Sequence, residues 1–195
     1  LAVWRAYLRQ HVLDAAAQAL PSAYVNAHFD YRSRAIRGIE AQPPRAEQVI
    51  VRITGNFGSE PLAEGLGQLY VARAFSPEAK ARAVAMVEDI NAAMRARIEK
   101  LDWMSAPTKL RAIGKLDAMA LKIGFPDRWK TYEGLTIARD DYAGNWLRAN
   151  AWEFQQRLAE LNRPVDRTRW LMSPHVVNAY AGSLNEIVFP AAILQ

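Results

Sequence analysis

The C-terminal stretch reads H-V-V-N-A-Y-A-G-S-L-N-E-I-V-F-P-A-A-I-L-Q (residues 175–195). Two segments rich in β-branched and aromatic residues, 175–180 and 185–189, flank a short connection at 181–184 that contains a glycine. This pattern predicts a β-hairpin. A hairpin on its own is only marginally stable in water. We therefore expect these strands to pack on, or pair with, another part of the protein.

The chain before the hairpin is predominantly helical in pattern. Residues 1–38 and 45–75 carry apolar side chains at three- and four-residue spacing, and the breaker G-I-E-A-Q-P-P (residues 38–44) separates them. Ser76-Pro77 and Ser105-Ala106-Pro107 each place a capping hydroxyl before an early proline, which predicts the start of a helix. The sequence thus predicts a mainly α fold with a terminal β-hairpin.

Three further expectations concern the middle of the chain. The helix that begins near Ser105 is predicted to run on to Gly124 and Pro126. Residues 130–141 (K-T-Y-E-G-L-T-I-A-R-D-D) are the best candidate for a linker. A large, mostly buried helix is expected after it, because apolar residues recur there at Trp146, Leu147, Trp152, Phe154 and Leu158.

Two smaller interpretations complete this part of the chain. The acidic pair Asp140-Asp141 has the residue types of a metal or acid/base site, but beside a linker a helix cap or a turn is the simpler interpretation. Trp103 and Trp129 stand at predicted helix ends, where core packing is the natural role for such large apolar groups.

Composition bounds the class of protein. The chain has 195 residues, of which 51% are hydrophobic and 10% aromatic, which is enough for a packed core and argues against disorder. It has no cysteine, so it holds no disulfide and no thiolate zinc site. No apolar run approaches the roughly 18 residues of a membrane span, and we predict no membrane contact within it. Because it begins at Leu1, we expect a fragment or a processed product.

The charge of the chain is basic but dispersed. The net charge is +5, and because residues 141–195 carry equal numbers of basic and acidic side chains, the excess belongs to residues 1–140. The arginines there stand singly rather than in a basic stripe, and no nucleic-acid-binding motif is present. We therefore predict no nucleic-acid partner; the alternative would show as salt-dependent binding to DNA or RNA.

The residues alone reveal no catalytic or metal site. The histidines His11, His28 and His175 are far apart, and none is paired at metal-ligand spacing. There is no H-E-x-x-H, no phosphate-binding glycine loop and no nucleophile-elbow serine. We predict no catalytic residue and no metal ligand within this chain, and interpret the three histidines as surface or core residues.

The terminal motif carries a family resemblance. V-N-A-Y (residues 177–180) followed by N-E-I-V-F-P-A-A-I-L-Q (residues 185–195) resembles the neprilysin and endothelin-converting-enzyme family of zinc metallopeptidases. Further stretches resemble family landmarks in the same order: 66–71, 101–104, 108–109 and 123–127. The resemblance extends over nearly the whole chain.

The resemblance implies a parent enzyme that cleaves short peptides with Zn²⁺. In this family the H-E-x-x-H zinc motif lies beyond I-L-Q, so the zinc ligands and the glutamate base would lie outside this chain, which by itself should bind no metal and hydrolyse nothing. Residues 1–138 would form the helical second domain that caps the catalytic domain, and residues 139–195 would begin a thermolysin-like catalytic domain. The family implies a periplasmic or extracellular location, with or without a membrane anchor.

The resemblance also implies three substrate-binding residues. Asn178 would bind the peptide backbone through its side-chain amide, and Ala179 would do so through its own backbone groups, as a peptide adds to a sheet edge. Ile193 would line the pocket for the residue after the cleaved bond. The alternative interpretation is that Asn178 only ends a strand and that Ile193 is an ordinary core residue.

Two departures from the family pattern bear on selectivity. Ala181 stands where the family usually has a second aromatic residue, and the spacing from Asn178 to Asn185 is one residue shorter than usual. A change of one residue can alter strand register. A non-catalytic helical interaction module, or a degenerate homologue without zinc ligands, is the alternative to a peptidase. We also expect apolar surface exposed by truncation, at Ile187, Phe189 and Ile193, to promote self-association.

Overall fold

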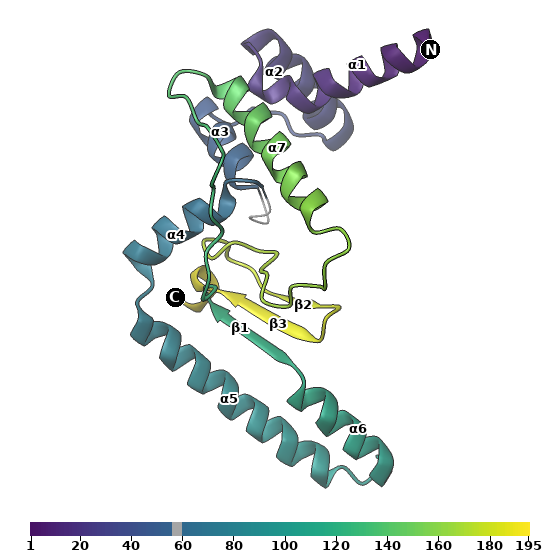
Figure 1. Ribbon diagram of the computed structural model, residues 1–195, viewed down its shortest axis with the longest axis vertical. Coiled ribbons are helices and arrows are strands. Elements are labelled where there is room, and N and C mark those ends of the chain that lie inside the picture. Colours follow the sequence, from purple (N-terminus) through teal and green to yellow (C-terminus); the bar gives the residue numbers. More distant parts are fainter. Residues whose placement is uncertain (56–59) are drawn as a thin grey trace. The chain divides into compact units, whose positions relative to one another are not determined.

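The computed structural model describes residues 1–55 and 60–195. Most of them are helical, which confirms the mainly α prediction with a small sheet near the C-terminus (Figure 1). The chain divides into two compact units. Unit 1 comprises Leu1–Val49 and Tyr132–Asn162, and unit 2 comprises Ile50–Thr131 and Arg163–Gln195.

Unit 1 is wholly helical in its regular structure. Its elements are α1 (Ala2–Ala16), the 3₁₀ turn η1 (Ala17–Ala19), α2 (Ser22–Phe29), the π-helical segment η2 (Asp30–Ala35) and α7 (Tyr142–Ala159); α3 (Arg45–Thr54) begins in this unit and ends in unit 2. Contacts of η1 with α1, α2 and α7 gather these helices. The apolar side chains buried there are mostly small, namely Ala17, Ala19, Val25, Phe29 and Ala149.

The start of α7 is set by a side-chain cap. The Oδ1 atom of Asp141 accepts a hydrogen bond from the Gly144 N–H at 2.8 Å, and Arg148 donates to Oδ2 at 3.0 Å. These two bonds, the backbone one first, lower the pKa of Asp141. The interpretation of Asp140-Asp141 as a cap is thus confirmed.

The expectation that α7 is mostly buried was wrong. Only Ala149 and Glu153 of this helix are buried, while Leu147 is 55% exposed and Phe154 59% exposed. A helix that packs through one narrow face leaves apolar residues on its other faces in solvent.

Trp103, which we expected in the core, is likewise 74% exposed.

Unit 2 combines helices with the sheet. It contains α4 (Ala63–Ala74), α5 (Pro77–Lys100), α6 (Ala106–Asp117), β1 (Ala120–Gly124), β2 (Tyr180–Gly182), β3 (Glu186–Pro190) and the 3₁₀ turn η3 (Ala191–Leu194). The strand order is β1-β3-β2, with β1 parallel and β2 antiparallel to β3. In Figure 1 the hairpin of α5 and α6 leads into β1, beside the yellow strand β3.

The predicted helix from Ser105 ends earlier than expected. It stops at Asp117, and residues 120–124 form β1 instead of a further helical turn. The Ala120 N–H donates to the Asn185 carbonyl at 2.9 Å, so the strand is fixed by a partner far along the chain. A short apolar run is compatible with either helix or strand, and here tertiary pairing decides.

The helix start predicted at Ser76 is confirmed, because the Ser76 side chain accepts a hydrogen bond from the Ala79 N–H at 3.2 Å.

The hairpin exists, but its first strand is shorter than predicted. It begins at Tyr180 rather than at His175. Local bonds hold the preceding residues: the Val176 N–H donates to the Ser173 carbonyl at 3.1 Å, and the Asn178 N–H donates to the Val176 carbonyl at 3.0 Å. Backbone groups engaged in such turns are not free to join a strand ladder.

A glycine in α4 permits close packing of the segment before the hairpin. A Cβ at Gly67 would lie 2.4 Å from Oγ of Ser173 and 2.7 Å from Cδ of Pro174. Ser173 is 3% exposed, and its Oγ donates to the Ala63 carbonyl at 2.8 Å. Position 67 therefore has no room for a side chain.

Gly67→Ala should accordingly lower the free energy of unfolding by about 1–3 kcal/mol, the usual effect of overpacking. Gly114→Ala is the matched control, because Gly114 is also helical and nothing lies within 4 Å of a Cβ there. The control should raise stability by about 0.5–1 kcal/mol through helix propensity. Urea denaturation of both variants measures the difference; equal effects would contradict the packing described here.

The two units do not divide the chain into 1–138 and 139–195. The sheet joins β1 to β2 and β3, which come from opposite sides of residue 138. The boundary between domains of a whole enzyme stays a prediction.

Apolar surface near the C-terminus is exposed in part. Ile193 is 38% exposed, whereas Ile187 and Phe189 are half-buried. Self-association through these residues stays a prediction. None of the helices that the structure describes is long and apolar enough to cross a bilayer.

Candidate functional site

The predicted substrate-binding residues lie at the edge of the sheet. Asn178 and Ala179 directly precede β2, which is the outer strand because β3 lies between it and β1. In the described part of the chain, no strand pairs with the outer side of β2. An unpaired edge of this kind can accept an extended peptide as an added strand.

Asn178 has an exposed side chain with one engaged and one available group. Its Oδ1 accepts a hydrogen bond from the Ala179 N–H at 2.8 Å. Its Nδ2 makes no hydrogen bond to any residue that the structure describes. An amide group can donate two hydrogen bonds through that nitrogen. The Asn178 side chain can thus offer a donor to a ligand while it holds the Ala179 N–H.

The segment that precedes Asn178 is held by hydrogen bonds to α4 and to η3. Pro174 is fully buried, and its carbonyl accepts from the Ala192 N–H at 3.0 Å. Ser173 bonds to the Ala63 carbonyl of α4. Residues 173 and 174, which precede the turn that carries Asn178, are therefore hydrogen-bonded to α4 and η3.

Ile193 belongs to η3, immediately after β3. Its turn is held at both ends, by the Ala192–Pro174 bond and by Gln195, whose Oε1 accepts from the Tyr70 hydroxyl at 3.2 Å and whose Nε2 donates to the Ala74 carbonyl. The bond from Ala192 to Pro174 thus joins η3, which contains Ile193, to the segment that leads to Asn178. With 38% of its surface exposed, Ile193 can present apolar surface to a ligand.

His175 is half-buried beside Ser173. The Ser173 hydroxyl has one hydrogen, which goes to the Ala63 carbonyl, so Nδ1 of His175 must donate to Oγ across the 2.9 Å contact. Nε2 then carries a lone pair, and this buried atom has no hydrogen-bond partner among the described residues. Burial lowers the pKa of His175, so the imidazole is neutral in the fold at pH 7.

This histidine should make stability depend on pH. The pKa is lower in the folded state than in the unfolded state, so the unfolded chain binds the proton first as pH falls. The free energy of unfolding should decline as pH drops below the unfolded value of about 6.5. His175→Asn keeps a donor in place of Nδ1–H but cannot be protonated. Urea denaturation between pH 7.5 and pH 5 should give a smaller decline for this variant, and equal slopes would exclude His175 as the cause.

The shorter turn of the hairpin is accommodated by one left-handed residue. Gly182 pairs with Glu186, which leaves a three-residue loop ending at Asn185 with φ +57°. Asparagine tolerates this conformation better than most residues, and a three-residue hairpin loop commonly ends in it. Nδ2 of Asn185 also donates to the Lys115 carbonyl at 2.8 Å. The register of β2 against β3 is thus fixed despite the shorter spacing.

Ala181 lies on the opposite face of β2 from its neighbours Tyr180 and Gly182. It is exposed and pairs with Ile187, which is only half-buried. An aromatic residue at position 181 would cover Ile187, as cross-strand pairs do. The departure at Ala181 therefore leaves Ile187 without an aromatic cross-strand neighbour at this position.

Sequence reasoning missed a buried ion pair below the hairpin. Nζ of Lys122 lies 2.6 Å from Oε2 of Glu186, with 8% and 4% of the two residues exposed. The sequence pattern predicts a helix at Lys122, and a helix there gives no reason to expect Glu186 as its partner. The alternation of Leu121, Lys122 and Ile123 is the one local signal that could have indicated a strand.

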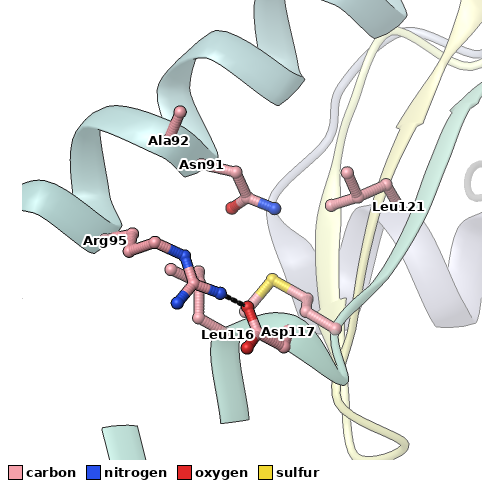
Figure 2. Close-up of a pocket in the computed structure, with 7 residues that line it drawn as sticks. Asn91, Ala92, Arg95, Leu116, Asp117 and Leu121 are labelled. Atoms are coloured by element: carbon pink, nitrogen blue, oxygen red, sulfur yellow. Dashed lines mark hydrogen bonds and ion pairs between the residues drawn. The ribbon is translucent and has the colours of Figure 1, made fainter. Parts of the chain in front are cut away.

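A separate cavity of about 280 Å³ lies between α5, α6 and β1. Figure 2 shows Arg95 and Asp117 paired at its side, so the guanidinium charge is already compensated. Asn91 and Leu121 also line it. It contains none of the predicted substrate-binding residues. Within residues 1–55 and 60–195, no three His, Asp or Glu side chains are grouped to hold a metal ion.

Comparison with known proteins identifies the family. The sequence profile described as Peptidase family M13 matches residues 1–126. An endothelin-converting enzyme homolog of Locusta migratoria is 40% identical over 138 residues, which cover 67% of this chain and 19% of that protein. Membrane metallo-endopeptidase-like 1 of Mus musculus is 31% identical over 187 residues, covering 91% of this chain and 24% of that protein.

Two solved structures are also similar to this chain over nearly its whole length. The Mycobacterium tuberculosis zinc metalloprotease Zmp1 in its open state has a TM-score of 0.84 at 38% identity, over 98% of this chain and 29% of that one. PepO from Lactobacillus rhamnosis HN001 has a TM-score of 0.81 at 31% identity, over 93% of this chain and 28% of that one.

These relatives define a class, the zinc metallopeptidases. The chain belongs to peptidase family M13, and the predicted neprilysin and endothelin-converting-enzyme resemblance is confirmed. It spans about a fifth of the length of the curated relatives it matches.

Proposed function

We propose that this chain is part of a zinc metalloendopeptidase that cleaves short peptides, and that β2 is the strand on which the peptide docks. The observation that carries the proposal is the placement of Asn178 and Ala179 at the entrance of an edge strand with no described partner on its outer side.

The chain would act by orienting its substrate. An extended peptide would form main-chain hydrogen bonds along β2, and Nδ2 of Asn178 would donate to a peptide carbonyl. Ile193 would supply apolar surface to the side chain after the cleaved bond. Zinc, when bound by residues we expect outside this chain, would polarise the scissile carbonyl and activate water.

We further propose that the two units belong to different domains of the parent. One sheet belongs to one hydrophobic core, so unit 2, which contains the sheet, would be part of the catalytic domain, and unit 1 part of the helical second domain. This division differs from the boundary expected after residue 138, because it assigns residues 50–131 to the catalytic domain. As the family resemblance implies, the helical domain of such a parent would cap its catalytic domain and enclose a chamber that admits peptides and excludes folded proteins. The location would be periplasmic or extracellular, with or without an anchor, as the family resemblance implies.

The test is hydrolysis by the zinc-loaded, full-length parent protein. It should cleave short synthetic peptides, lose activity with a chelator, regain it with Zn²⁺, and leave a folded protein of similar composition intact. Absence of hydrolysis in the metal-loaded protein would favour the non-catalytic or degenerate alternative.

A further inference from the structure

A buried polar cluster lies beneath β2 and takes no part in the proposed chemistry. Nζ of Lys122 donates to Glu186 and also to the Arg169 carbonyl at 2.6 Å. Removing two charges from water costs more than their attraction returns, unless the geometry is good and the remaining groups are bonded. Such pairs are retained in some proteins to fix a register rather than to add stability.

Glu186 of this cluster packs against Gly182, the last residue of β2. Gly182 stands opposite Glu186 across the antiparallel pair. A Cβ at position 182 would lie 2.3 Å from Oε1 and 2.7 Å from Cγ of Glu186. A side chain at position 182 would therefore displace the Glu186 side chain or move β2 away from β3. The ion pair and the glycine together set how closely β2 approaches β3.

Lys122 is also connected to the first residue of β2, through its hydrogen bond to the loop that contains Arg169 and Leu171. The residue two positions after Arg169 is Leu171, whose N–H donates to the Tyr180 hydroxyl at 3.1 Å. Lys122 thus holds the segment that holds Tyr180, the first residue of β2. Asn178 lies only two residues before Tyr180, so any displacement of β2 moves the amide that the peptide would bind.

We propose that Lys122, Glu186 and Gly182 are positioning residues that set the place of β2, and with it the register in which an extended peptide binds. The inference rests on the proposed function and adds residues that determine which peptide bond is cut. Register matters because side chains alternate in direction along a strand. A misplacement of about 1 Å can lower the rate about 100-fold.

The experiment compares Gly182→Ala with Gly114→Ala in the zinc-loaded parent enzyme, on short peptides that contain two adjacent cleavable bonds. Mass spectrometry gives the ratio of the two products. Active-site titration gives the concentration of competent enzyme, by which the measured rates are divided to obtain kcat/KM. Gly182→Ala should lower kcat/KM by about 10- to 100-fold and change the product ratio. Gly114→Ala should match the wild type in both.

The product ratio does not depend on how much enzyme folds, so a merely structural role would leave it unchanged. If Gly182→Ala yields no folded enzyme, the double variant Lys122→Met/Glu186→Leu serves instead, because it removes the ion pair without leaving either charge buried and unpaired. An unchanged product ratio in the folded variant would overturn this inference alone. A wild-type parent that cleaves no peptide would remove the proposed function, and the inference with it.

Discussion

Lys122→Met should lower the free energy of unfolding by about 3–5 kcal/mol, because it leaves the Glu186 carboxylate buried without its partner. The double variant Lys122→Met/Glu186→Leu should recover most of this loss, since an apolar pair of similar size needs no compensating charge. Urea denaturation of the chain followed by tryptophan fluorescence measures both.

The matched control is the exposed pair of Arg95 and Asp117, whose side chains are 41% and 53% exposed. Asp117→Asn should cost no more than about 1 kcal/mol, because solvent screens exposed pairs. Similar losses for Lys122→Met and Asp117→Asn would show that the buried pair is not held as described.

Asn178→Ala should lower kcat/KM of the parent enzyme for short peptides by about 10- to 100-fold. Leaving one buried hydrogen-bonding group of the substrate unpaired costs about 1–3 kcal/mol, and about 1.4 kcal/mol corresponds to a factor of ten in rate. Steady-state kinetics on a peptide that spans the cleavage site measure the effect.

Asn178→Asp separates the two functions of this side chain. It keeps an oxygen for the Ala179 N–H and removes the Nδ2 donor, so it should lose as much activity as Asn178→Ala. Asn26→Ala, at an exposed asparagine of α2, is the control and should keep wild-type kinetics. Full activity in Asn178→Asp would rule out the amide donor.

The features that could be predicted from the sequence are those set by neighbouring residues. The caps at Ser76 and Asp141 depend on bonds that span three residues, and both helix starts follow from local patterns. The hairpin is equally local, since its strands are joined by a short turn. The family resemblance, carried by contiguous motifs, assigned Asn178 and Ala179 to substrate binding, and that assignment stays a prediction.

The features that could not be predicted depend on distant partners. β1 is a strand because Ala120 to Gly124 pair with Glu186 to Pro190, and no local pattern encodes that pairing. The burial of Lys122 follows from the same pairing. Trp103 and Phe154 satisfy the composition of a core residue yet lie in solvent, because composition does not say which face of an element is covered.

Hydrogen exchange with mass spectrometry tests the docking strand most directly. The zinc-loaded parent enzyme would be compared with and without a peptide-like inhibitor that binds the metal. A peptide added along β2 should slow exchange of the backbone amides of residues 178–182, whereas those of α1 should not change. Binding of the inhibitor with no added protection at residues 178–182 would contradict the account.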